Sequence, residues 1–326
     1  MIRAQTILGS AIALLGVTAL VLVFRTPAEV APARSFTSSQ QCKECHAQEH
    51  AEWSASQHAH SWLNPDVRAL SNDFANTDCI DCHAPQEIYS TGIGARVLPR
   101  ASRRAEGVDC IACHALPDGG VAGTKDNPAA PCRPQAMASL KSVDHCAGCH
   151  DQHKTVSQWR ETQYAAQGIG CVECHMPARA DGSGHDHTMH GGHSLETVRK
   201  AVTLVAERSK GLVRVALTNS GAGHHFPTDE RSRAADLWWR PVAPEGAPAE
   251  SWRHLWRFRS PYRHEVDLVD TLLPSAATKE VWVDDPASQG AVEVALTYKR
   301  TPYWKDPLRP DPETEAEFVH RVVLQP

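Results

Sequence analysis

Cysteine and histidine recur in one fixed pattern, Cys-x-x-Cys-His, which occurs five times in the chain. This pattern attaches c-type haem, because the two thiols add to the two porphyrin vinyl groups and the histidine becomes an axial ligand of the iron. We therefore predict five covalently bound haem c groups. The binding residues are Cys42, Cys45 and His46; Cys79, Cys82 and His83; Cys110, Cys113 and His114; Cys146, Cys149 and His150; and Cys171, Cys174 and His175.

Two other uses of paired cysteines fit the sequence less well. A structural zinc site shares its ligands between two pairs and gives no reason for a histidine after every second cysteine. A thioredoxin-like motif needs one pair near a βαβ pattern, not five. The eleventh cysteine, Cys132, lies outside the motifs. Three roles stay open for it: a free thiol, an unusual sixth haem ligand, or an intermolecular disulfide.

Histidines outside the motifs are candidates for the sixth, distal position of each iron. Nineteen histidines are present and five belong to motifs, which leaves fourteen. A Gly-rich stretch after the fifth motif holds four of them, and from it we expect one or two distal ligands. We prefer His187 and His190 to His185 and His193. A separate copper or zinc site, or a solvated loop, is the alternative for this cluster.

Other histidines stand in less distinctive surroundings. One of His58 and His60, on a predicted helix behind Trp53, is expected to be axial. The segment GAGHHFPT (221–228) follows a strand end, and we expect His225, in preference to its neighbour His224, to ligate a haem. A turn with a packed histidine is the alternative. Reserve candidates are His50, His145 and His153, and a structural role is expected for His254, His264 and His320.

The N-terminal segment indicates export. Residues 6–24 form an apolar run, and Ala31-Pro32-Ala33 resembles a signal-peptidase site. Residues 1–35 are therefore a signal peptide or a membrane anchor, slightly favouring the anchor, and the rest of the chain is expected in the periplasm. The net charge is −5 and no Lys/Arg run occurs, so nucleic acid is not an expected partner.

The rest of the chain divides by composition. Residues 36–195 hold all the haem motifs and few Val, Ile or Leu residues, so the porphyrins must supply the core of a pentahaem domain. Residues 196–326 show alternating strand patterns at 212–218, 265–269, 279–283, 291–298 and 317–324, after a short helix at 195–202. We predict an α+β multidomain protein: a mostly helical or irregular haem-packed domain followed by an antiparallel β-sandwich.

An internal repeat relates two parts of the haem region. Residues 42–62 align with 146–167, and each copy has a haem motif followed by Trp-x-x-Ser/Thr-x-His/Tyr. Helices are expected at 43–62 and 155–167. Tyr164 stands in the second copy where His58 stands in the first. Each unit is thus a haem, a helix and a residue presented towards a neighbouring haem.

The motifs CKECH, Trp53-x-x-Ser56-x-His58, CIDCH, GVDCIACH and IGCVECHMP resemble multihaem cytochromes c related to a tetrahaem cytochrome of nitrifying bacteria. That cytochrome accepts electrons from hydroxylamine oxidoreductase. The resemblance covers roughly residues 40–195. It implies that His58 is the distal ligand of the third motif and that the second motif corresponds to a haem whose iron can lack a sixth ligand. In the relative a distal histidine follows the third motif, whereas here none lies between His114 and His145.

Electron transfer by haem-to-haem hopping is the expected function, since bis-histidine iron is coordinatively saturated. Partners would be redox proteins such as a membrane quinol oxidase or other cytochromes. One alternative is an oxidoreductase that acts on a small nitrogen or sulfur compound at an open haem, with Tyr164 as the hint. Another is a subunit of an extracellular cytochrome filament or another oligomer. No catalytic residue is predicted, and enzyme activity is the less favoured reading.

Overall fold

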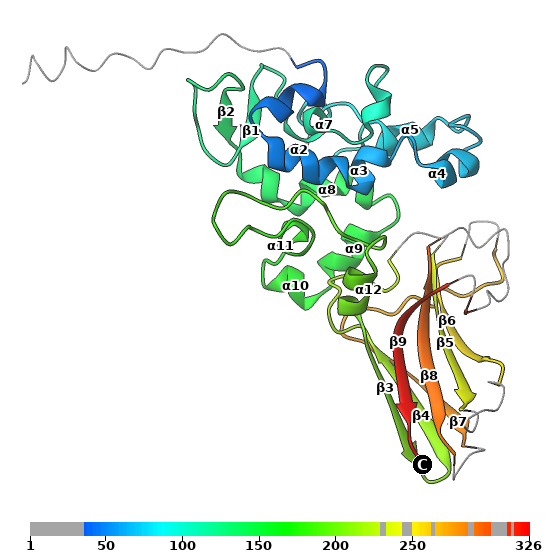
Figure 1. The fold of residues 1–326 in the computed structure, drawn as a ribbon. Coiled ribbons are helices and arrows are strands. Elements are labelled where there is room, and N and C mark those ends of the chain that lie inside the picture. The colour runs from blue at the N-terminus through cyan, green and yellow to red at the C-terminus, as the bar shows by residue number, and fades with distance from the viewer. Residues whose placement is uncertain are drawn as a thin grey trace, which may run out of the picture.

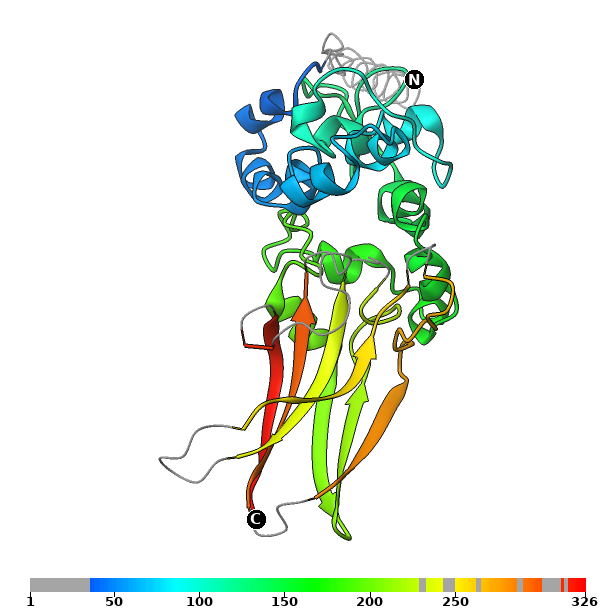
Figure 2. The ribbon, with the colours of Figure 1, turned by 90° about the vertical axis from the view of Figure 1, so that its right-hand side faces the viewer.

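A computed structural model describes residues 36–228, 233–242, 250–261, 265–285, 290–300, 312–313 and 316–326. The predicted export segment and His264 lie outside these residues. In the described ranges, no helix is both long and apolar enough to cross a membrane. A helical part and a β part lie end to end along the molecule, with the C-terminus at the far end of the β part (Figures 1 and 2).

The helical part consists of short elements joined by irregular chain. In order these are η1 (Ser39–Glu44), α2 (Ala47–Ser54), α3 (Gln57–His60), α4 (Pro65–Leu70), α5 (Asp78–His83), α6 (Ile88–Thr91), η2 (Arg104–Glu106), α7 (Cys110–His114), β1 (Val121–Gly123), β2 (Pro134–Ala136), η3 (Ala138–Lys141), α8 (Val143–His150), α9 (Thr155–Arg160), α10 (Gln163–Ala166), α11 (Cys171–His175) and α12 (Leu195–Ala201). Strands β1 and β2 form a small parallel pair.

The two copies of the repeat break at the same place. Each predicted helix is a pair of shorter helices, α2 with α3 and α9 with α10, and the second helix of each pair starts after Ser56 or Thr162. Ser56 caps α3 by accepting a hydrogen bond from the Ala59 amide at 3.3 Å, which is a usual role for serine at a helix start. Two continuous helices were predicted, so the break corrects that prediction.

The tryptophan of each repeat copy fixes the backbone that leads into a later haem motif. The Trp53 indole N–H donates to the Val108 carbonyl at 2.8 Å, and Val108 lies two residues before the third motif. The Trp159 indole donates to the Ile169 carbonyl at 2.9 Å, two residues before the fifth motif. Each copy of the repeat therefore positions a later motif as well as its own.

The β part is an antiparallel sandwich. One sheet has the order β3 (Thr203–Ser209), β4 (Leu212–Thr218), β7 (Thr278–Asp284), and the other has the order β6 (Arg253–Phe258), β5 (Ala234–Pro241), β8 (Val292–Lys299), β9 (Glu317–Leu324). Val213, Val215 and Leu217 of the first sheet pack with Leu237 and Val294 of the second in one buried cluster. The chain is therefore an α+β protein of the predicted class.

Four of the five predicted strand segments correspond to β4, β7, β8 and β9. The fifth, 265–269, is wrong, since it forms turns and bends. Val266 and Val269 are exposed there, by 82% and 79%, because no neighbouring strand covers the alternating pattern. Strands β3, β5 and β6 were not predicted. In β5 the residues 234–239 are all buried, so this central strand shows no alternation.

A buried carboxylate joins two neighbouring strands of the second sheet, β5 and β6. Asp236 on β5 is 1% exposed and accepts from His254 Nε2 and Arg257 Nε, both at 2.8 Å. Burial by itself would raise the pKa of Asp236, but the hydrogen bond from His254 and the charge of Arg257 outweigh it and lower the pKa. The ionised form is thus the one that the fold stabilises.

We expect Asp236→Asn to lower the free energy of unfolding of the β part by about 2 kcal/mol, because a buried charge-assisted network loses its anion. Because the folded pKa is depressed, the difference from wild type should be present above about pH 4 and should shrink as the pH falls through the folded pKa. Denaturant unfolding followed by circular dichroism measures it. Glu280→Gln, in an exposed pair with Arg214, is the control and should change stability little. Equal effects of both variants would contradict the prediction.

Candidate haem sites

Each haem motif occupies about one helical turn. Motif 1 (Cys42–His46) runs from η1 to the start of α2, whereas motifs 2 to 5 lie in α5, α7, α8 and α11, each of which ends at its motif histidine. In a helix, residues i and i+3 lie on one face. Both thiols of a motif therefore point to the same side, as the two vinyl groups of one porphyrin require.

Three motif histidines face another histidine across a gap. The ring centres of His150 and His58 are 6.0 Å apart, and those of His114 and His187 are 6.4 Å apart. His175 faces His224 at 6.3 Å. The rings of such a pair are too far apart to touch. Two imidazoles bound to one metal through nitrogens at about 2 Å have ring centres roughly 6 Å apart, so the spacing fits an iron between them.

The outer nitrogens of these rings are also arranged as axial ligands require. A backbone carbonyl only accepts hydrogen bonds, so a ring nitrogen that contacts one carries the proton and leaves Nε2 free for the iron. Nδ1 of His114 donates to Ala122 O at 2.8 Å, and Nδ1 of His175 donates to His190 O at 2.7 Å. Two of the three distal rings do the same: His187 Nδ1 donates to His185 O at 2.8 Å and His224 Nδ1 to His225 O at 2.9 Å.

Burial favours the neutral form of four of these six rings. It lowers the pKa of His58 to about 3 and that of His224 to about 4, and it also lowers the pKa of His114 and of His150. A neutral imidazole has a free lone pair, which metal coordination needs. The residues present therefore fit haem c in both spacing and protonation.

Motif 2 has a different neighbour. The ring that faces His83 is that of Phe74, at 6.0 Å between centres, while His83 Nδ1 donates to Ser61 O at 3.0 Å. A phenyl ring cannot coordinate iron. Phe74 is 5% exposed and stacks on Trp62 at 4.0 Å with an interplanar angle of 6°. The resemblance implied an open iron at this motif, and this packing fits that implication.

A strained turn holds Phe74 in place. Asn72, Asp73 and Phe74 have φ of 50°, 57° and 62°, a left-handed conformation that is unfavourable for each of them. The turn is tied by an ion pair between Arg68 and Asp73 at 2.5 Å. The Ser71 hydroxyl also accepts from the Phe74 amide at 2.9 Å. Such strain persists only where surrounding contacts fix the chain, so the position of Phe74 is well determined.

The distal candidates from the sequence lie in different places. His58, which the resemblance paired with motif 3, faces motif 4, and His187 faces motif 3. His60 and His190 are exposed, although the His190 carbonyl accepts from His175 Nδ1. Sequence reasoning preferred His225, whereas the ring opposite His175 is that of His224. Phe74 was missed entirely, because an apolar residue in a loop carries no ligand signal.

The loop that carries His224 is built rigidly onto the helical part. Asn219, 1% exposed, donates to the His224 carbonyl at 2.8 Å and accepts from the Ala222 amide at 3.1 Å. The Gln158 side-chain oxygen on α9 accepts from the His225 amide at 3.2 Å. The His225 side chain lines a small hollow of about 220 Å³ at this junction. The β part thus presents one histidine to the fifth motif and packs the next against α9.

Contacts between thiols show which motifs are neighbours. Cys42 of motif 1 hydrogen-bonds with Cys110 of motif 3. Likewise, motif 2 contacts motif 4 through Cys82 and Cys149, and motif 4 contacts motif 5 through Cys146 and Cys171. In a haem protein the same sulfurs are thioethers at the porphyrin edge, so the contacts report adjacency of the motifs and not thiol chemistry.

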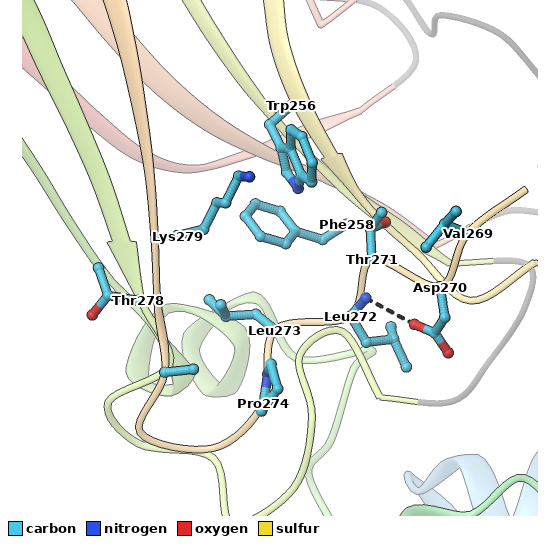
Figure 3. A pocket seen from close by; sticks show the side chains of 11 residues that line it. Trp256, Phe258, Val269, Asp270, Thr271, Leu272, Leu273, Pro274, Thr278 and Lys279 are labelled. Carbon is cyan, nitrogen blue, oxygen red and sulfur yellow. Dashed lines mark hydrogen bonds between the residues drawn. The ribbon is translucent and has the colours of Figure 1, made fainter.

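Another hollow, of about 460 Å³, lies within the β part beside Trp256, Phe258 and Leu273 (Figure 3). Lys279 Nζ lies 3.3 Å from the centre of the Trp256 ring. The lining includes no haem-motif residue, and it offers no cluster of ligands. In the described ranges, no group of three or more His, Cys, Asp or Glu side chains could hold a separate metal ion.

The motifs and their facing rings fit a protein that binds several haem c groups. Residues 41–115, which include the first three motifs, match the family model described as "Cytochrome c554 and c-prime". The match covers this part of the chain alone. No curated protein matches the chain.

Among solved structures, the chain is similar to a penta-heme cytochrome c552 from Thermochromatium tepidum. The two are 19% identical with a TM-score of 0.64, over 88% of this chain and 98% of that one, so they share a fold. A carbohydrate-binding module of family 56 (11% identity, TM-score 0.18, 38% of this chain and 98% of that one) also matches. So does a superoxide reductase from Nanoarchaeum equitans (14%, 0.19, 31% and 83%). TM-scores of 0.18 and 0.19 do not indicate a shared fold.

The two adjacent histidines of the β part give a matched pair of variants. We expect His224→Ala to keep all haems while one haem becomes high-spin and the reduced protein binds one more carbon monoxide per chain. The reason is that His224 faces His175 and His225 does not. His225→Ala is the control and should leave the spectra unchanged. Haem-stained gels, EPR and carbon monoxide titration measure the outcome, and a spin change in the control alone would contradict it.

Proposed function

We propose that the protein is an exported, periplasmic pentahaem c-type cytochrome that carries electrons between redox partners. The single observation that supports this most is the set of three facing histidine pairs at 6.0–6.4 Å. When bound, haem supplies a one-electron centre whose potential depends on its axial ligands and its burial. Two nitrogen ligands leave no position for a substrate, which favours electron transfer over catalysis.

The chain would hold each cofactor through its motif and one distant residue. We assign His187 to the haem of motif 3, His58 to that of motif 4 and His224 to that of motif 5, and we assign no protein ligand opposite His83. All ten motif cysteines would be thioether donors. Backbone carbonyls fix the distal rings of His187 and His224 through Nδ1, whereas Nδ1 of His58 contacts the Met189 sulfur.

The motif contacts give the cofactors a connected order. Motif 1 is beside motif 3, and motif 4 is beside motifs 2 and 5. Both cysteines of motif 4, Cys146 and Cys149, lie near enough to Cys113 of motif 3 to feel its charge, which indicates that these motifs are also close. The order 1–3–4–5 with motif 2 as a branch at 4 would let electrons enter at one end of the series and leave at the other.

We propose a haem domain over 36–195 and a β domain over 196–326, with residues 1–35 as the export signal or anchor. The β domain would donate His224 and cover the fifth motif. Redox proteins, such as a quinol oxidase of the membrane or other cytochromes, are the partners that this function requires. Assembly into a filament stays an alternative that electron microscopy of the purified protein would test.

A second function is favoured by Phe74. An iron that faces a phenyl ring keeps a coordination position for an exogenous small molecule, so redox chemistry on a small nitrogen or sulfur compound at motif 2 is the runner-up. Arg68 lies 5.8 Å from the Phe74 ring centre, and Arg104 lies 5.2 Å from that of Trp62. These cations would favour an anionic ligand at the approach to this site.

Mass spectrometry and spectroscopy test the proposal together. The denatured mature protein should weigh the chain plus five haems, and its EPR spectrum should show at least three low-spin ferric haems, one for each facing pair. Fewer haems at full maturation would refute the pentahaem assignment. Fewer than three low-spin haems would contradict the distal ligands.

Replacing Phe74 tests the open position. We expect Phe74→Ala to bind carbon monoxide faster in the reduced state with an unchanged stoichiometry of one per chain, because the phenyl ring blocks the approach to the iron opposite His83. Tyr164→Phe is the control, since Tyr164 packs near Gly223 and not on motif 2. Flash photolysis gives the rates. An unchanged rate in Phe74→Ala would place the open iron elsewhere.

A further inference from the structure

No ring has yet been placed opposite His46, the histidine of motif 1. His46 follows Cys45 at the start of α2, and His58, His187 and His224 are each opposite another motif histidine. The sequence lacks a histidine between His114 and His145, which removes the nearest source after motif 3. The ligand must come from elsewhere in the chain.

The segment that follows motif 5 runs along the helix that starts at His46. Arg179 binds two carboxylates of α2, with Nη1 2.8 Å from Glu49 and Nη2 2.5 Å from Glu52. The same Glu52 carboxylate accepts from the His187 amide at 2.9 Å. Residues 179–187 are therefore held against α2 at both of their ends.

A short hairpin brings His185 to this place. The Arg179 amide donates to Gly184 O at 2.8 Å, Ala178 and His185 form an antiparallel bridge, and the Asp186 amide donates to the Pro177 carbonyl at 3.0 Å. Because Arg179 is anchored on α2, the hairpin fixes His185 beside the same helix.

The His185 ring is arranged like the rings that face motif histidines. Its Nδ1 donates to the Met176 carbonyl at 2.6 Å, so the proton is on Nδ1 and the Nε2 lone pair is free. Among the described histidines, Nδ1 donation to a backbone carbonyl is found in His83, His114, His175, His185, His187 and His224. Five of these six rings face another ring at a haem motif, and the sixth is that of His185.

The spacing of His185 and His187 matches two neighbouring haems. Residues two apart on an extended segment project to the same side. His187 faces motif 3, and motif 3 is next to motif 1 through the Cys42–Cys110 contact. A His-x-His segment that gives His187 to motif 3 would thus direct His185 towards the adjacent motif 1.

The competing histidines are engaged or closed off. Nε2 of His50 and both ring nitrogens of His145 are buried against protein atoms, whereas a ligand must face the space that a macrocycle fills. His193 and His254 use Nε2 for contacts with Arg233 and Asp236, and His320 Nε2 contacts Val202 O. His60, His153 and His190 are exposed.

We propose that His185 is the distal ligand of the haem at motif 1, so that His185-Asp186-His187 ligates two adjacent haems from one strand of chain. This rests on the proposed pentahaem function. His185 acts here as an iron ligand, and Arg179 positions it by tying the hairpin to α2.

Spectroscopy of the haem-loaded protein tests the proposal. His185→Ala should keep five haems by mass while one of the five, about a fifth of the haem spectrum, converts from low-spin to high-spin and binds one additional carbon monoxide. His60→Ala, at a histidine with an exposed side chain, is the control and should not change the spectra. Unchanged spin in His185→Ala would overturn the proposal. Conversion of one haem to high spin in Cys132→Ser would also overturn it, because that result would make Cys132 the sixth ligand.

Two further variants identify the haem and allow for poor folding. In a Cys42→Ala/Cys45→Ala background, which lacks the first haem, adding His185→Ala should cause no further spin change, and a new high-spin haem there would place His185 on another motif. His185→Met keeps a ligand, so it should stay low-spin, raise the potential of one haem and gain the charge-transfer band of methionine-bound iron; absence of all three would overturn the proposal. A wild-type haem count below five would instead refute the proposed function.

Discussion

The helical part cannot form a hydrophobic core from its own side chains, and this constraint explains most of its structure. The large buried cluster of the described chain belongs to the β part and its adjoining helix α12, with residues from Val198 to Val319. The helical part has a small cluster around Phe74, Ile80 and Ala84. Apolar burial is the main favourable term in folding, so the porphyrins must supply it. Short helices and long irregular connections are sufficient when each one only has to line a flat macrocycle.

The motif residues of each site could be predicted from the sequence, and the distal ring opposite each motif could not. Thioether chemistry fixes the spacing of Cys171, Cys174 and His175 within one helical turn, so local sequence determines it. A distal ring comes from anywhere that the fold brings near. The resemblance assigned the candidate His58 to motif 3, whereas its ring faces His150 of motif 4. Between His224 and His225 no local pattern decides, because the choice depends on how Asn219 turns the loop.

The β part could be predicted as a class but not in its role. Alternation identified β4, β7, β8 and β9, and it misled at 265–269, where the exposed Val266 and Leu268 have the two-residue spacing of a strand. The repeat likewise indicated that Trp53 and Trp159 were important without showing why. Their indoles tie the chain just before motifs 3 and 5. Long-range hydrogen bonds of this kind leave no mark in composition or periodicity, and Phe74 opposite His83 leaves none either.

The facing rings join residues that are far apart in the chain, and this has a consequence for biogenesis. If the chain is exported from its N-terminus and haem is attached as the motifs emerge, Cys110 and His114 would acquire their porphyrin before His187 has emerged, and the fifth motif would precede the loop with His224. Each proposed iron site would then spend a period with a vacant coordination position. Folding of the C-terminal domain would close the last of these sites.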